Sequence, residues 1–190
     1  MLEKLKSGMG SPRALAAYAS LVKSVDHKMR RIHASHQDEM NCGPGCDRCC
    51  RTSRSVLAVE GFFMLMALRR IPSEPLEKLM NKAHAEPCAC PLLDERGRCV
   101  IYDSRPLLCR THGAPLLVDT GDETGVTMCD KNFTQRDLDA AFIPEEVFNT
   151  IGMNEKLVEV NKSFTNGHLP YHHRISVLDI LKAALRGEDA

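Results

Sequence analysis

Cys42-Gly43-Pro44-Gly45-Cys46-Asp47-Arg48-Cys49-Cys50 is the stretch that decides how this chain is interpreted. Its cysteines are separated first by three residues, then by two, and the last pair is adjacent. Sulfur–zinc bonds are about 2.3 Å long, so the sulfurs of a tetrahedral site must come within about 4 Å of each other. Short loops allow this, and the glycines and proline bend the first loop. The same spacing suits cubane iron–sulfur clusters. The stretch therefore predicts a metal site held by irregular backbone.

The adjacent pair, Cys49 and Cys50, bears on the number of metal atoms. Neighbouring side chains of an extended chain point to opposite sides. We therefore expect these two thiols to serve two metal centres, two irons of one cluster, or one metal and the core. This favours a multinuclear or paired site over a single zinc finger.

A second group of cysteines lies further along the chain, at Cys88, Cys90, Cys99, Cys109 and Cys129. Cys90-Pro91 is typical of the Cys-Pro that ends many cluster motifs. Arg105, Arg110 and nearby backbone amides can offset the negative charge of bound thiolates. Either group alone makes an awkward ligand set, so we expect the cysteines of 42–50 and 88–129 to converge in space.

The cysteines also bear on whether the protein is located in a reducing or an oxidising compartment. Nine cysteines is an odd number, which fits poorly with full disulfide pairing. No secretion signal is visible at the start, and the most apolar stretch, Val56–Leu68, is interrupted by Glu60 and too short to span a bilayer. We therefore predict a cytoplasmic protein without membrane association, whose thiols stay reduced and available to metal.

Composition narrows the class of protein further. The chain has 190 residues, 43% of them hydrophobic, which suits a single domain over residues 1–190 with a real core. Its net charge is zero, whereas nucleic-acid binders usually carry a basic surplus, so no nucleic-acid partner is expected. The basic cluster Lys28–Arg31 is interpreted as the solvated face of a helix.

The fold class that we predict is mainly α. Ser11 and Pro12 open a long N-terminal helix over 11–41, because apolar residues recur there every three or four positions. Residues 42–133 form an irregular cysteine-cluster region. Its regular elements are predicted at 57–70 and 73–84 (helices), 98–102 (a strand), and 114–118 with 125–128 (a small β-hairpin).

Residues 134–190 form the C-terminal helical region. Pro144-Glu145-Glu146 is predicted to open a helix that runs to about residue 165, because carboxylates are favourable near a helix N-terminus. Ser176-Val177-Leu178-Asp179 is similar to a capping box and predicts a last helix to about residue 186.

In these motifs the chain resembles the YkgJ-like cysteine-cluster family, whose members are described as zinc- or iron-chelating. The matching pieces, over roughly residues 42–133, are Cys42-x3-Cys46-x2-Cys49-Cys50, Cys90-Pro91-Leu92-Leu93, Gly97–Tyr102, Arg105–Arg110 and Cys129-Asp130-x-Asn132-Phe133. The resemblance implies a metal-ligand set of Cys42, Cys46, Cys49, Cys50, Cys90, Cys99, Cys109 and Cys129. It leaves Cys88 as an extra cysteine and transfers no reaction.

Other residues admit two interpretations each. His112, three residues after Cys109, is a legitimate zinc-ligand spacing and can complete a site if a cysteine does not bind. His36 lies on the apolar stripe, which favours core packing over ligation. Glu60 is interpreted as a structural helix residue, with an acid/base role at the cluster as the alternative. Cys46 and Cys49 can also form a redox-active disulfide, although the usual βαβ context is absent.

Three functional hypotheses follow. The first is a metal-binding protein holding an iron–sulfur cluster, with zinc as the alternative, in a redox, sensing or metal-handling role. The second is an enzyme that uses the cluster for redox chemistry or protein modification, which would need an open coordination position. The third is a structural zinc module that contacts a protein partner. No catalytic residues can be named from the sequence.

Overall fold

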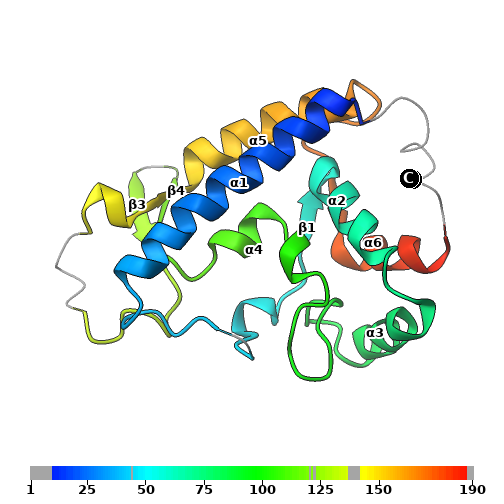
Figure 1. The fold of residues 1–190 in the computed structure, drawn as a ribbon, viewed down its shortest axis with the longest axis horizontal. Coiled ribbons are helices and arrows are strands. Elements are labelled where there is room, and N and C mark those ends of the chain that lie inside the picture. The colour runs from blue at the N-terminus through cyan, green and yellow to red at the C-terminus, as the bar shows by residue number, and fades with distance from the viewer. Residues whose placement is uncertain (1–9, 44, 120, 122, 137–141, 188–190) are drawn as a thin grey trace. The chain divides into compact units, whose positions relative to one another are not determined.

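The computed structural model describes residues 10–187 except positions 44, 120, 122 and 137–141. The predicted fold class is confirmed: the chain is mostly helical, with a long N-terminal helix, small sheets in the middle and helices after them (Figure 1). The α-helices are α1 (Pro12–Ser35), α2 (Ala58–Leu68), α3 (Ser73–Ala85), α4 (Leu107–Thr111), α5 (Thr150–Thr165) and α6 (Val177–Leu185). The strands are β1 (Ser55–Leu57), β2 (Leu116–Asp119), β3 (Thr124–Thr127), β4 (Phe148–Asn149) and β5 (Arg174–Ser176). Single 3₁₀ turns are η2 (Arg48–Cys50), η3 (Tyr102–Ser104) and η4 (Pro144–Glu146).

Contacts divide the chain into two compact units. The first unit comprises residues 1–18, 44–106 and 158–190, and the second comprises 19–43 and 107–157. The prediction of one domain over the whole chain stays a prediction.

The first unit is organised around the antiparallel pair of β1 and β5, in which Val56 lies opposite Ile175. Helices α2 and α3 both pack against α6 (Figure 1). The core is aliphatic, as the scarcity of aromatic residues requires, and Leu68 and Leu181 are fully buried in it. At the start of α6 the Ser176 hydroxyl accepts a hydrogen bond from the Asp179 amide at 3.0 Å. The Asp179 carboxylate accepts the Ser176 hydroxyl at 2.7 Å, so the N-cap half of the predicted capping box is present.

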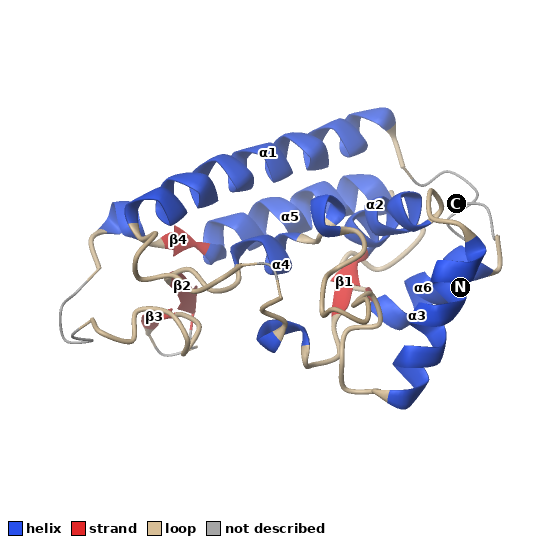
Figure 2. Cartoon of the chain, turned by 60° about the horizontal axis from the view of Figure 1, so that its bottom comes forward, coloured by secondary structure: helices blue, strands red, loops and turns tan. Residues whose placement is uncertain are grey.

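The second unit contains a three-stranded sheet in the order β3-β2-β4 (Figure 2). Strands β2 and β3 form the predicted hairpin, with Leu117 opposite Val126. Strand β4 joins β2 in parallel through Leu116 and Phe148. The sequence did not predict this strand, because its two residues show no pattern of their own.

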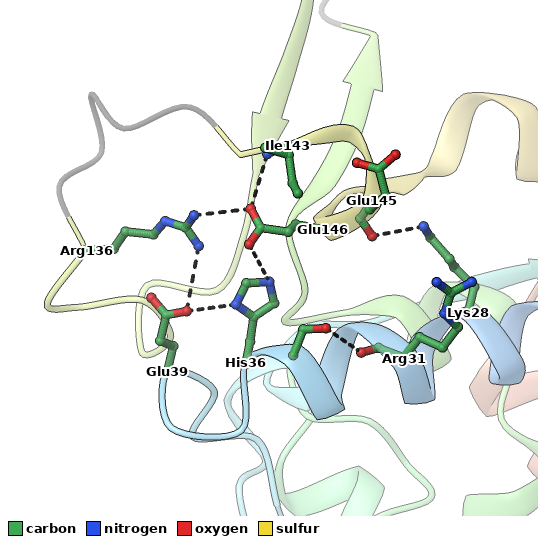
Figure 3. Close-up of polar contacts among 9 residues, drawn as sticks. Lys28, Arg31, His36, Glu39, Arg136, Ile143, Glu145 and Glu146 are labelled. Atoms are coloured by element: carbon green, nitrogen blue, oxygen red, sulfur yellow. Dashed lines mark hydrogen bonds and ion pairs between the residues drawn. The ribbon is translucent and has the colours of Figure 1, made fainter.

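The prediction of a helix opening at Pro144 was wrong, because α5 begins only at Thr150. Pro144–Glu146 instead forms η4, after which pairing with β2 draws Phe148 into an extended conformation. The Glu146 carboxylate accepts a hydrogen bond from the Ile143 amide at 3.1 Å and pairs with Arg136 at 3.2 Å (Figure 3). The carboxylate thus still caps a helical turn, now the 3₁₀ turn η4, and also binds Arg136.

Helix α1 ends at Ser35, earlier than the predicted 41, since the chain turns at His36–Glu39. The His36 ring is buried and binds the Glu39 carboxylate at 2.7 Å (Figure 3). It also packs edge-on against Phe133. The Glu39 carbonyl accepts the Phe133 amide at 2.8 Å, so its hydrogen bond goes to a distant segment rather than to a longer helix. His36 is therefore a packing residue, which was the favoured interpretation.

Two shorter elements also differ from prediction. The strand expected at 98–102 is reduced to an isolated bridge between Leu93 and Cys99, and Tyr102 already begins η3. Helix α4, with Cys109 at its centre, lies where only irregular backbone was expected. No helix in the described part of the chain is long and apolar enough to span a membrane.

Candidate metal centre

The cysteines are divided between the two units. The first unit contains Cys46, Cys49, Cys50, Cys88, Cys90 and Cys99, and the second contains Cys42, Cys109 and Cys129. None of the nine cysteines is held in a disulfide. The thiols are therefore available as ligands in both units.

Cys49 and Cys50 lie closer together than an extended chain would allow. Both belong to the 3₁₀ turn η2, and their Sγ atoms are 3.9 Å apart. The expectation that the pair points to opposite sides was wrong, because it assumed extended backbone. A separation near 4 Å is that of two thiolates on one metal atom. Adjacency therefore no longer argues for two separate centres.

A backbone hydrogen bond brings part of the second cysteine group, Cys90 and Cys99, to this pair. The Cys90 amide donates to the Cys50 carbonyl at 2.7 Å. Cys99 bridges Leu93 in the short loop that follows, and Asp94 closes that loop by accepting amide hydrogen bonds within it. Cys49, Cys50, Cys90 and Cys99 thus belong to one neighbourhood of the first unit.

A cation lies in the same neighbourhood. The Arg54 guanidinium donates to the Cys49 carbonyl at 2.8 Å and exerts a favourable electrostatic effect on the thiolate forms of Cys49 and Cys90. A tetrathiolate site around a divalent ion carries a net charge of −2, so a neighbouring cation stabilises it. Arg105, which the sequence named for this task, has the same effect on the Cys99 thiolate, whereas the sequence missed Arg54.

The thiols of this neighbourhood resist ionisation when no metal is bound. The pKa of Cys49 is raised well above its ordinary value by its hydrogen bond with Cys50 and by burial. Burial is the main cause that raises the pKa of Cys90 and of Cys99. Metal binding must therefore displace protons from these thiols.

The other two cysteines of the first unit are Cys88 and Cys46. Cys88 is exposed, in keeping with its interpretation as an extra. Cys46 is half-buried, and in the part of the chain that the structure describes it makes no hydrogen bond to another cysteine. Its assignment as a ligand stays a prediction.

In the second unit, Cys42 is held by an asparagine. The Asn132 side-chain amide donates to the Cys42 Sγ at 3.2 Å and to the Gly113 carbonyl at 2.7 Å. Its oxygen accepts the Asn41 amide at 2.8 Å, and the residue is 4% exposed. Asn132 lies within the motif that carried the resemblance, but the sequence assigned it no role.

Gly113 leaves room for that thiol. Its φ is +100°, and a Cβ added there would lie 2.5 Å from the Cys42 Sγ. Gly113 follows Cys109 by four residues, and Asn132 follows Cys129 by three. The Cys42 thiol therefore contacts the segments that directly follow the other two cysteines of its unit.

Cys109 is positioned by its neighbour. Arg110 is 8% exposed and binds both carboxylate oxygens of Asp26, at 2.8 and 2.9 Å. This ion pair ties α4 to α1 within the second unit. His112 continues the same turn, donating its amide to the Leu108 carbonyl at 3.2 Å. Its role as an additional ligand stays a prediction.

Among the described residues, no three His, Cys, Asp or Glu side chains already form a metal site. The residues nevertheless fit zinc or iron by their chemistry, since the donors are thiols and one pair has the spacing of a chelate. Binding metal would then require the thiols to turn toward it.

Glu60 has a structural role at the start of α2. It is 4% exposed, and its carboxylate accepts the Leu57 amide at 3.1 Å. This is the reach-back half of a helix N-terminal cap. The structural interpretation of Glu60 is thereby supported, and it does not serve as evidence for catalysis.

Comparison with known proteins identifies the family. The CxxCxxCC family model, described as a "putative zinc- or iron-chelating domain", matches residues 41–136. The chain belongs to the CxxCxxCC family. The match begins beside Cys42 and ends beyond Cys129, so every cysteine of the chain lies within the family domain. No match was found among curated proteins or among solved structures.

Proposed function

We propose that the domain binds metal through Cys42, Cys46, Cys49, Cys50, Cys90, Cys99, Cys109 and Cys129, and that the metal is iron in an iron–sulfur cluster. The observation that carries the proposal is the Cys49–Cys50 pair at 3.9 Å, with Cys90 hydrogen-bonded beside it. A bound cluster would supply electron transfer or redox sensing, and metal handling is the further role that such a site can serve.

The spacing of the pair constrains the kind of cluster. In a cubane each iron takes a single cysteine, whereas a [2Fe–2S] centre places two cysteines on each iron. A separation of 3.9 Å therefore favours the second arrangement. It equally suits mononuclear zinc, which is our second candidate and would make the domain a structural or interaction module.

The division of the cysteines supports a separate contribution from each unit. Cys49, Cys50, Cys90 and Cys99 are four thiols within the first unit, enough for one tetrathiolate set. Cys42, Cys109 and Cys129 supply three in the second, where His112 is the candidate fourth ligand. Nine cysteines without a disulfide suit a reducing compartment such as the cytosol, which is the location that we propose.

Elemental analysis and a visible spectrum of protein purified without oxygen test the proposal. Iron with acid-labile sulfide and absorption near ~400 nm would establish the cluster. Zinc in a colourless protein would select the second candidate. A protein that binds neither metal would refute both.

Two variants localise the site. Cys49→Ser is expected to lower the metal content and the melting temperature together, because metal binding is coupled to folding. Cys88→Ser is the matched control, since Cys88 is exposed and outside the proposed ligand set. Equal metal loss in the two variants would contradict the assignment.

A further inference from the structure

The first unit contains a pocket of about 330 Å³ with no cysteine in its lining. It lies where the end of α2, the start of α3 and the end of α6 meet. The residues that matter here are Arg69, Ile71, Ser73, Leu76, Ala184 and Leu185. Its volume is at the lower end of the range for small-molecule sites, so it would take a ligand of few atoms.

The pocket is lined by a cationic side chain. Arg69 follows the last residue of α2 and is half-buried, and among the described residues its Nη2 atom is shielded from solvent without a hydrogen-bond partner. A buried N–H left unpaired is costly, more so when it carries charge. Arg69 thus brings to the pocket lining a positive charge that no described residue compensates, and an anion would compensate it. Its neighbour Arg70 is exposed and absent from the pocket lining.

The start of α3 adds further donors. Its N-cap residue is Pro72, and no side chain caps the first turn. Glu74 could have supplied the negative charge, but its carboxylate binds Lys78 at 2.8 Å and its side chain is 78% exposed. The first amide groups of α3, including that of the pocket-lining Ser73, therefore add positive potential at this helix end.

The rest of the lining is hydrocarbon, from Ile71, Leu76, Ala184 and Leu185. A bare inorganic anion would leave this surface without a partner, whereas an anion with an apolar tail would cover it. We propose that the pocket binds a small organic carboxylate. The carboxylate pairs with the Arg69 guanidinium, and the short alkyl chain packs against Leu76 and Leu185.

Titration of the ¹⁵N-labelled full chain with hexanoate, followed by NMR, tests this site. Binding with a Kd of about 1 mM is expected for so small a ligand, with shifts centred on the amides of Ser73, Ala184 and Leu185. Arg69→Gln should weaken binding by about tenfold or more, because a charge-assisted hydrogen bond is lost. Arg70→Gln removes the same charge outside the pocket and should leave the affinity unchanged.

Two further probes separate the elements of recognition. Hexylamine matches the alkyl chain with the opposite charge, and inorganic phosphate supplies charge without the chain; both should bind more weakly than hexanoate. Ser73→Asp places a carboxylate at the start of α3, which favours the helix but repels the ligand. This variant should fold and lose hexanoate, so the proposal stays testable if Arg69→Gln is unfolded.

Three results would overturn the proposal. They are no hexanoate binding to the wild-type chain, unchanged affinity in folded Arg69→Gln or Ser73→Asp, and binding of hexylamine or phosphate as tight as that of hexanoate. None of these measurements depends on metal, so they test the pocket independently of the proposed metal site.

Discussion

Replacing Gly113 with alanine probes the packing around Cys42. Gly113 has a φ of +100°, a conformation that L side chains rarely adopt, and an added Cβ would lie 2.5 Å from the Cys42 Sγ. It would also lie 3.2 Å from the Asn132 side-chain nitrogen. The change therefore combines backbone strain with a steric overlap at a proposed metal ligand.

The two costs can be estimated separately. A non-glycine residue at positive φ costs about 1–2 kcal/mol. Relieving an overlap in a packed region typically costs a further ~1–3 kcal/mol, because side chains must leave their preferred rotamers. We expect Gly113→Ala to lower the free energy of unfolding by about 2–5 kcal/mol in total.

Gly121→Ala is the matched control. Gly121 has a φ of +94°, but a Cβ added there meets nothing within 4 Å. This variant should show the strain cost alone, about 1–2 kcal/mol. The difference between the two variants then measures the overlap with Cys42 and Asn132.

Urea denaturation of the metal-free proteins gives both values, provided that the slope of unfolding free energy against urea is unchanged. The metal content of the same variants after reconstitution reports on Cys42, and only Gly113→Ala should reduce it. If Gly113→Ala were no more destabilising than Gly121→Ala, the close packing at Cys42 would be refuted.

Three other predictions concern the same region. Asn132→Ala should lower the free energy of unfolding by about 1–3 kcal/mol, because it leaves the Gly113 carbonyl and other buried groups unpaired; a urea melt that matches the wild type would contradict this. Asp26→Asn should lower the free energy of unfolding by about 1–3 kcal/mol, since Arg110 is 8% exposed and loses its charged partner. Glu74→Gln, which removes one charge of an exposed ion pair, should leave the urea melt unchanged. Burial raises the pKa of Cys90 in the folded state above that of an unfolded thiol. The free energy of unfolding of the metal-free protein should therefore be constant below pH ~8.5 and fall as the pH rises above it. Urea melts should show that the free energies of unfolding of the wild type and of Cys90→Ser become more similar toward alkaline pH.

Much of the helical framework could be predicted from local sequence. Helix α3 was placed at 73–84 and spans Ser73–Ala85, because the breaking Pro72 and the apolar periodicity both act over a few residues. The β2–β3 hairpin and the cap of α6 follow from equally local signals. The metal-binding family was also visible in the sequence, since the order and spacing of cysteines do not depend on how the chain folds.

The errors occur where a distant segment competes with a local preference. Phe148 pairs with β2, and the Glu146 carboxylate binds Arg136, so the expected helix start at Pro144 became a 3₁₀ turn and a strand. The Phe133 amide donates a hydrogen bond to the Glu39 carbonyl, and this contact helps to end α1 early. Such partners lie far away in sequence and leave no periodic pattern.

For this protein, the sequence by itself determined the metal-chelating family and the mainly helical class, because cysteine order and short-range periodicity carry that information. Tertiary structure decided the arrangement within each unit: the 3₁₀ turn that brings Cys49 and Cys50 to 3.9 Å, the Asn132 amide on Cys42, and the Arg69 side chain in the pocket lining. The physical reason is that hydrogen bonding and burial depend on which groups meet in space. The spacing of residues along the chain does not specify those contacts.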